Sequence, residues 1–282
     1  MRKYLVMIVL SLFIGMACAP KVPDVKKIKE TVNELKIENH PDDKMVEIVW
    51  EGLPEELPYG MDGINIYLSD DPGLKDKKAE EAEDYLLNEK PITQDGSLTV
   101  ENLENGTKYY VQFRAVVQGD PLDEGSDLHA FYPRPTGTMG LSWGTVILVL
   151  ANQDAFGFDR TTGYPTVYEA TEENKENIDF VTEWKDGEIT IKAAKEKWTD
   201  ARDAYIRDPG VLAEEWYEHI EGASDVEEYS SSLDATTGKV YEIATYDNYY
   251  GKIVVDSTKE EGGVQKAWVR WAFQPKQGVA GY

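Results

Sequence analysis

The chain of 282 residues has a single cysteine, Cys18, and three histidines. One cysteine excludes an internal disulfide framework and a zinc site built from cysteines, and three histidines leave little room for a histidine metal cluster. Basic residues are also scarce, with 29 Lys and Arg against 53 Asp and Glu, a formal net charge of −24. This charge argues against a protein that binds nucleic acid by neutralising phosphates. We therefore expect no nucleic-acid partner and no cofactor.

Hydrophobic residues make up 41% of the chain and aromatic residues 11%, which is enough for packed cores. The length is typical of one or two domains.

Residues 1–17 have the features of an export signal. Arg2 and Lys3 give a basic start, and an apolar run follows over residues 4–16. This run is short for a helix that spans a bilayer permanently, so a secretory signal is favoured over a membrane anchor or a buried strand.

Residues 14–18 refine this prediction. The segment Ile-Gly-Met-Ala-Cys resembles a lipobox, in which a lipidated cysteine becomes the mature N-terminus, with Gly15 at the position where leucine is usual. Ordinary signal cleavage after Ala19 would place Pro20 beside the scissile bond, where proline is poorly tolerated. Lipidation of Cys18 with several acyl chains would anchor the protein stably in a membrane. Ala19 after the cysteine resembles Gram-negative lipoproteins of the outer membrane, with the body facing the periplasm or the cell exterior.

Residues 18–30 contain proline and lysine without a sustained apolar period. They predict a tether that holds the first domain away from the lipid surface, as a solvated spacer or with its lysines at anionic headgroups.

Residues 31–135 have an all-β pattern. Val46, Ile48 and Trp50 alternate with polar residues, and further strands are predicted at 64–68 and 109–115.

The motif Leu103-x-x-Gly106-Thr107-x-Tyr109, together with Trp50, resembles a fibronectin type III domain over residues 31–135. The resemblance implies a β-sandwich in which Tyr109 forms a tyrosine corner, its hydroxyl bonding upstream backbone. The charged stretch 75–90 is long for this family and predicts a short surface helix.

Residues 136–282 form a second β-rich domain and contain six of the seven tryptophans. Hydrophobic spacing predicts a hairpin over 178–191 and strands over 240–274, and two short amphipathic helices over 194–205 and 212–220. The predicted fold class is thus mainly β: a fibronectin type III-like sandwich followed by a β-rich domain with two short helices.

Segments 239–245, 250–255 and 271–275 resemble the C-terminal strands of HmuY-type lipoproteins. The resemblance implies a largely β fold and a lipoprotein context. Haem capture in that family uses a histidine pair, and here only His219 lies in the domain, with His129 before it. Haem is therefore not expected.

Tyr249 and Tyr250 lie in a predicted turn, and Trp268 lies on a polar strand face. The three residues predict a candidate aromatic surface for a protein or saccharide partner, with ordinary strand packing as the alternative.

Three clusters rich in acidic residues raise the alternatives of a catalytic pair or a calcium site. Glu214, Glu215 and Glu218 fit a solvated helix face better than a catalytic pair. Two oxygen-rich clusters lack the Asp-x-Asp-x-Asp-Gly pattern of a calcium loop, so no metal is expected; they are Asn152, Asp154 and Asp159, and Asp225, Glu227 and Glu228. His40 and His129 are interpreted as surface or loop histidines.

These observations predict a non-catalytic envelope lipoprotein that binds a ligand or partner through its second domain, with the first domain as spacer or docking module. Two alternatives remain open: a structural subunit of an envelope or extracellular assembly, and a carbohydrate-binding accessory protein. An enzyme is not expected, because no catalytic motif is present.

Overall fold

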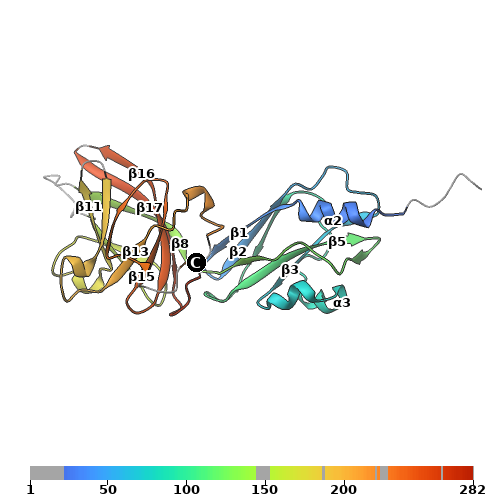
Figure 1. The fold of residues 1–282 in the computed structure, drawn as a ribbon, viewed down its shortest axis with the longest axis horizontal. Helices are drawn as coiled ribbons and strands as arrows, with labels where there is room; N and C mark the ends of the chain where they lie inside the picture. Colours follow the sequence, from blue (N-terminus) through green and yellow to red (C-terminus); the bar gives the residue numbers. More distant parts are fainter. Residues whose placement is uncertain are drawn as a thin grey trace, which may run out of the picture.

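The computed structural model describes residues 22–143, 153–185, 188–219, 221–222, 228–261 and 263–281. Cys18 and the predicted export signal lie outside these residues. The chain is 47% strand and 13% helix, which confirms the mainly-β prediction. Its strands form two lobes that lie end to end (Figure 1), and every strand pairing is antiparallel. None of the helices in the described part of the chain has the length and apolar character needed to cross a membrane.

The first lobe has two facing sheets. One has the strand order β1-β2-β4 and the other β3-β5-β6, with β7 also paired to β5. The strands are β1 (Lys36–Asp42), β2 (Met45–Glu51), β3 (Met61–Ser69), β4 (Gly96–Val100), β5 (Tyr109–Val117), β6 (Asp120–Pro121) and β7 (His129–Phe131).

Alternation along β2 places Val46, Ile48 and Trp50 in the core between these sheets, as predicted. The indole Nε1 of Trp50 donates a hydrogen bond of 2.9 Å to the carbonyl of Gln94, so the buried ring leaves no donor unpaired.

A helical insertion covers the outer face of the second sheet. It consists of η1 (Pro72–Asp76), α3 (Ala79–Ala82) and η2 (Glu83–Tyr85), which confirms the predicted helical character of residues 75–90. Beneath it, Arg114 of β5 is fully buried, donates to the carbonyl of Leu74 at 2.9 Å, and lies 5.1 Å from the ring centroid of Tyr67. The insertion therefore converts a face that alternation predicts to be solvated into a buried polar layer.

The predicted tether is wrong over its last six residues. Helix α2 (Val25–Asn33) begins there, capped by Asp24, whose carboxylate accepts the backbone N–H of Lys27 at 3.2 Å. Ile28 and Val32, four residues apart, are buried against the first lobe's core, so the helix belongs to the lobe.

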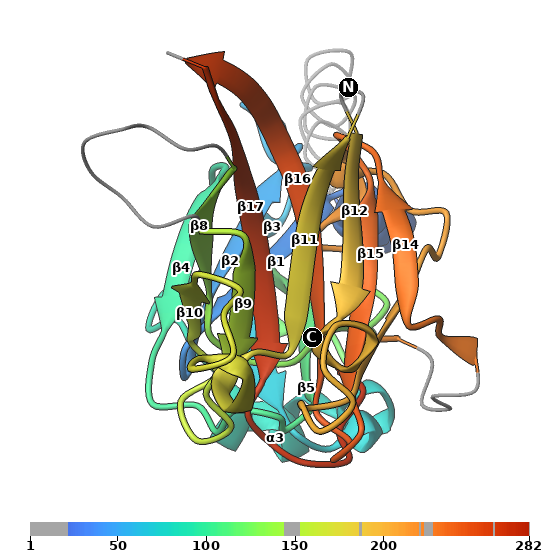
Figure 2. The same ribbon diagram turned by 90° about the vertical axis from the view of Figure 1, so that its left-hand side faces the viewer.

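The second lobe also has two facing sheets. In Figure 2 the molecule is turned so that this lobe faces the viewer. Their strand orders are β10-β9-β11-β12-β14 and β13-β15-β16-β17-β8. The elements are β8 (Thr136–Trp143), β9 (Ala155–Phe158), β10 (Pro165–Tyr168), η3 (Lys175–Asn177), β11 (Phe180–Lys185), β12 (Glu188–Ala193), η4 (Ala194–Glu196), β13 (Ala204–Arg207), η5 (Ala213–Glu215), β14 (Ser232–Ala235), β15 (Val240–Thr245), β16 (Tyr250–Glu261) and β17 (Val264–Gln274).

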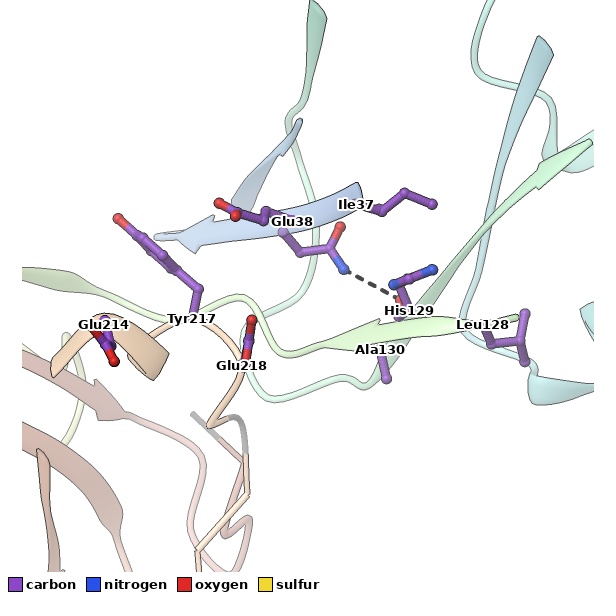
Figure 3. A pocket seen from close by; sticks show the side chains of 9 residues that line it. Ile37, Glu38, Leu128, His129, Ala130, Glu214, Tyr217 and Glu218 are labelled. Atoms are coloured by element: carbon purple, nitrogen blue, oxygen red, sulfur yellow. Dashed lines mark hydrogen bonds between the residues drawn. The ribbon is translucent and has the colours of Figure 1, made fainter. Parts of the chain in front are cut away.

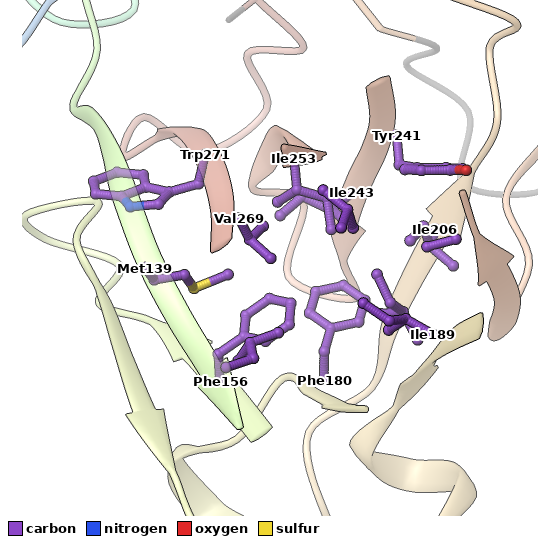
Figure 4. Close-up of a cluster of buried hydrophobic side chains, with 14 of the residues drawn as sticks. Met139, Phe156, Phe180, Ile189, Ile206, Tyr241, Ile243, Ile253, Val269 and Trp271 are labelled. Carbon is purple, nitrogen blue, oxygen red and sulfur yellow. The ribbon is translucent and has the colours of Figure 1, made fainter. Parts of the chain in front are cut away.

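Aromatic and aliphatic side chains from both sheets fill the space between them (Figure 4). Phe158 stacks on Phe273 with ring centroids 4.3 Å apart, and Phe156 stacks on Phe180 at 5.2 Å. Val269, Trp271 and Phe273 of β17 face this core, as the sequence predicts.

The two amphipathic helices predicted in this lobe are wrong. Residues 194–205 form the single turn η4 and then strand β13, in which Ala204 and Ile206 point into the core. The described part of the second predicted helix, residues 212–219, has the turn η5 as its only helical element. Trp198 and Ala201 do pack together with Ala194, which is why their spacing imitates a helix.

Residues 132–135 connect the lobes and are hydrogen-bonded to both. The N–H of Arg134 donates to Asp42 at 3.1 Å in the first lobe. The carbonyl of Pro135 accepts from the N–H of Phe273 at 3.3 Å in the second lobe. Figure 1 shows the C-terminal end of the chain at this junction, where the side-chain amide of Gln274 donates to the carbonyl of Gly281 at 3.3 Å.

Candidate binding groove between the lobes

The predicted aromatic surface is not assembled. Tyr250 begins β16 and is buried, packed with Tyr229 and Ala244. Trp268 is 38% exposed but lies six positions away along β17 from the partner of Tyr250, a separation of about 20 Å.

Tyr249 is half-buried: its ring is stacked on Phe273 and lies under the guanidinium of Arg160 at 5.5 Å. A tight turn does form here. Its residue Asn248 has a φ of 61°, and this turn allows Tyr249 and Tyr250 to pack inward.

Tyr109 has the contact that its motif predicts. Its hydroxyl accepts a hydrogen bond from the backbone N–H of Glu104 at 3.2 Å, five residues upstream. Its ring stacks on Phe131 with centroids 5.8 Å apart. The role of Tyr109 is therefore to hold a loop of the first lobe.

A groove of about 300 Å³ lies where the two lobes meet (Figure 3). Three segments line it, each contributing three residues: Ile37, Glu38 and Asn39; Leu128, His129 and Ala130; and Glu214, Tyr217 and Glu218. The first two segments belong to the first lobe and the third to the second lobe. Tyr217 also lines a neighbouring hollow, so its ring separates two concave regions of the junction.

The wall from the second lobe is the segment 211–219, here called the strap, which crosses the outer face of the sheet that contains β15 and β16. The N–H of Val240 donates to the carbonyl of Val211 at 3.0 Å, which fixes the start of the strap. Trp216 is buried and packs against Val254 and Ala272. Because Trp216 points into the lobe, its neighbour Tyr217 projects toward the groove.

Two basic side chains lie against the Trp216 ring. Lys252 Nζ lies 4.4 Å from the ring centroid, and the Arg270 guanidinium carbon lies 4.9 Å from it. Lys252 is fully buried and donates hydrogen bonds to the carbonyls of Trp216 and, at 2.6 Å, of His219. Burial lowers the pKa of Lys252 well below its usual range. A buried amine therefore fixes the backbone turn that presents Tyr217 and Glu218.

The end of the strap is held by a second buried polar side chain, Glu242 of β15. Its carboxylate contacts Arg207 at 2.7 Å, His219 at 2.8 Å and the hydroxyl of Tyr229 at 3.1 Å. The hydrogen bond to Glu242 raises the pKa of Arg207, and burial raises that of Tyr229. Since Glu242 and Lys252 are cross-strand partners, one pair of strands carries both anchors.

The strap also contacts the first lobe directly. The rings of Tyr217 and His40 stack with centroids 4.1 Å apart. The His40 imidazole in turn lies 3.1 Å from the carboxylate of Glu38. A short way along the chain, Glu221 accepts hydrogen bonds from Lys108 and Tyr132 of the first lobe. These contacts join the second lobe to the first beside the groove.

The lining of the groove is acidic. Glu38, Glu214 and Glu218 all border it, and Lys36 pairs with Glu38 at 2.6 Å. The hydrogen bond from Lys36, followed by that from His40, lowers the pKa of Glu38.

The two polar residues deeper in the groove are neutral. Burial lowers the pKa of His129, so its imidazole is uncharged at neutral pH. Asn39 is 9% exposed; its amide nitrogen donates to the His129 carbonyl at 3.4 Å, while its buried Oδ1 has no hydrogen-bond partner among the described residues. The carboxylates at its border therefore make the groove negatively charged toward a ligand.

Sequence reasoning missed this site. His40 and His129 were interpreted as isolated histidines, and Glu214 and Glu218 as a solvated helix face. Both glutamates are indeed exposed, but they border a concave surface that forms only when residues far apart in the chain meet. No local pattern signals such a junction.

Within the described residues, no cluster of three or more His, Cys, Asp or Glu side chains is arranged to hold a metal ion. Asp154 and Asp159, which belong to an oxygen-rich cluster without the calcium-loop pattern, accept backbone N–H groups of Ala170, Thr161 and Thr162. Asn152, Asp225 and Glu227 lie outside the described residues. No protein-family profile matches the sequence, and no curated protein matches it.

Proposed function

We propose that this chain is a lipid-anchored protein of the bacterial outer membrane that binds a partner in the groove between its lobes without transforming it. The lipobox-like segment 14–18 supports the anchor. The resemblances to fibronectin type III domains and HmuY-type lipoproteins are in keeping with a modular surface protein.

One observation carries the binding proposal: both lobes line the groove, and one wall is fixed in advance by the buried Lys252. A wall that is already ordered loses little conformational entropy when a ligand binds. The contribution of Tyr217 from the second lobe agrees with a binding role for that lobe, while the first lobe supplies the opposite wall instead of acting only as a spacer.

The lining favours a cationic, donor-rich group. The carboxylates of Glu38, Glu214 and Glu218 border the groove, and Lys36, which pairs with Glu38, is the one basic side chain beside them among the described contacts. Ile37, Leu128 and the Tyr217 ring offer apolar surface beside these acceptors. A lysine or arginine side chain of a partner protein combines a cation with an apolar stem and fits this chemistry.

Ligand-observed NMR with a panel of short peptides, amines and saccharides tests this function. We expect basic peptides to bind, Tyr217→Ala and Glu218→Gln to weaken binding, and the distant Glu55→Gln to leave it unchanged. Binding of saccharides alone would favour the carbohydrate-binding alternative, and binding that survives Tyr217→Ala would exclude the groove. The anchor is tested separately by mass spectrometry of the mature protein and of Cys18→Ala.

A structural subunit is the second candidate. The outer half of β16, residues 256–261, is exposed and extends beside the start of β17. This ribbon carries Lys259, Glu260 and Lys266, charges of the kind that discourage edge-to-edge association. Light scattering of the purified protein decides between the candidates, since a subunit would form concentration-dependent oligomers.

A further inference from the structure

The free end of the first lobe exposes large apolar side chains. Val22 is 79% exposed, Val25 is 41% exposed and Tyr59 is 50% exposed. We call these three residues the end patch. In Figure 1, helix α2, which Val25 begins, lies at the end of the first lobe away from the second lobe.

The members of the end patch lie on one surface. Gly60, next to Tyr59, packs so closely on Pro23 that an added Cβ would lie 2.5 Å from the proline ring. A shallow hollow lined by Lys27 and Thr31 of α2 is lined on its other side by Pro58 and Tyr59. The loop that carries Tyr59 therefore runs beside the start of α2.

The length of chain before Val22 limits how far this surface can be from an anchor at Cys18. Only residues 19–21 intervene, and a fully extended chain spans at most about 3.6 Å per residue. Val22 thus lies within about 14 Å of the lipidated residue, less than the thickness of a headgroup layer plus a few water layers.

We propose that the end patch rests in the headgroup region of the membrane that holds the anchor, so that the first lobe stands directly on the lipid surface. This inference rests on the lipid anchoring proposed above. It replaces the spacer expected from residues 18–30, because α2 has taken the last six of those residues into the lobe.

The chemistry of the patch fits a lipid interface. Tyrosine favours this layer because its ring is apolar and its hydroxyl is polar, and exposed valines gain by leaving water. The charges nearby are mixed: α2 carries Lys26 and Lys27, and the loop before Tyr59 carries Glu55 and Glu56. Contact with lipid is therefore driven by apolar burial and needs no anionic lipid.

This placement of the end patch also determines how far the groove lies from the lipid surface. The strands β3 and β5 have nine residues each and run along the first lobe, which corresponds to about 30 Å. The groove lies at the opposite end of this lobe from the patch, so a partner would bind well above the headgroups, where a protein chain can reach it.

The test uses the full lipidated protein in vesicles of phosphatidylethanolamine and phosphatidylglycerol. Because lipidation consumes Cys18, Val25→Cys or Tyr59→Cys introduces the single free thiol for an environment-sensitive fluorophore. Tyr246→Cys is the matched control, since Tyr246 is 62% exposed in the second lobe. We expect nitroxide-labelled lipids to quench the label at positions 25 and 59 several-fold more than at 246, equally in vesicles without phosphatidylglycerol and in about 1 M salt, where charges are screened within about 3 Å.

Three results would overturn the inference. They are equal quenching at all three positions, quenching that salt abolishes, and energy transfer between labelled copies at position 59, which would mean that a second copy covers the patch. The acyl chains at Cys18 are measured first by mass spectrometry. Their absence contradicts the proposed function, whereas their presence with unquenched labels contradicts only the placement of the patch.

Discussion

The ring of His40 lies on the ring of Tyr217, with 4.1 Å between centroids and 26° between planes. This stack joins the first strand of one lobe to the strap of the other. It also closes one side of the groove, so the same contact bears on the stability of the junction and on the shape of the candidate site.

Removal of the stack should loosen the junction measurably. We expect Tyr217→Ala to lower the free energy of unfolding by about 1 kcal/mol, the value typical of an aromatic pair, and the melting temperature by about 2–4 °C. Tyr246→Ala serves as the control because Tyr246 is 62% exposed and stacks on no other ring of the described residues. Equal melting temperatures for Tyr217→Ala and the wild type in calorimetry would show that the stack adds nothing.

Loss of the buried amine should free the strap. Lys252→Met keeps most of the side-chain volume but removes the donors to the carbonyls of Trp216 and His219. We expect a loss of about 3 kcal/mol, as is usual when one partner of a buried polar network is removed. Hydrogen exchange should become faster at residues 211–219.

The matched comparison is Lys192→Met, which removes a partly exposed lysine paired with the exposed Glu183 at 2.8 Å and should cost less than about 1 kcal/mol. Unchanged exchange in the strap of Lys252→Met would contradict the anchoring role of the amine.

Acid should destabilise the protein through His129. Burial lowers the pKa of this histidine in the folded state below its ordinary value of 6.5. As the pH falls from about 6.5 toward the folded-state pKa, the unfolded chain binds more protons than the folded one, so the unfolding free energy decreases.

The His129→Gln variant lacks this group. Its urea midpoint should fall less than that of the wild type between about pH 7 and the folded-state pKa of His129. An NMR titration of His129 at or above 6.5 would refute the prediction.

Close backbone packing makes Gly157 indispensable. A Cβ at this position of β9 would overlap the carbonyl oxygen of Asn177, whereas a Cβ at Gly140 of β8 meets nothing within 4 Å. We expect Gly157→Ala to lower the unfolding free energy by roughly 2 kcal/mol and Gly140→Ala to change it by less than about 0.5 kcal/mol. Similar denaturation midpoints for the two variants would be inconsistent with this packing.

Where one face of a strand is buried and the other is solvated, alternation identified the core correctly, as for Val46, Ile48 and Trp50. The same rule failed on β5, because Arg114 is buried on the outer face beneath an insertion that lies elsewhere in the sequence. Helical spacing at Ala194, Trp198 and Ala201 reflects a real cluster, but one reached by a turn followed by a strand.

The candidate site could not be predicted from sequence patterns for a different reason. Trp216 and Tyr217 are adjacent aromatic residues, and contacts of Trp216 with the buried Lys252, Arg270 and the apolar residues beneath it decide which of the two faces inward. Tyr249 and Tyr250 look like exposed turn residues until the positive φ of Asn248 returns the chain into the lobe. A tertiary contact fixes the side-chain direction in the first case, and a backbone conformation that hydrophobic spacing does not reveal fixes it in the second.

The connection between the lobes has a mechanical consequence. Two of its four residues are prolines, which fix φ, and its carbonyls and N–H groups are bonded to Asp42, Gly106 and Phe273. Such a joint has little freedom to bend or stretch. If a partner bound in the groove were pulled, the force would be transmitted through the first lobe with little bending at this connection. The hydrogen bonds of residues 132–135 would carry that force before the strands of either lobe separated.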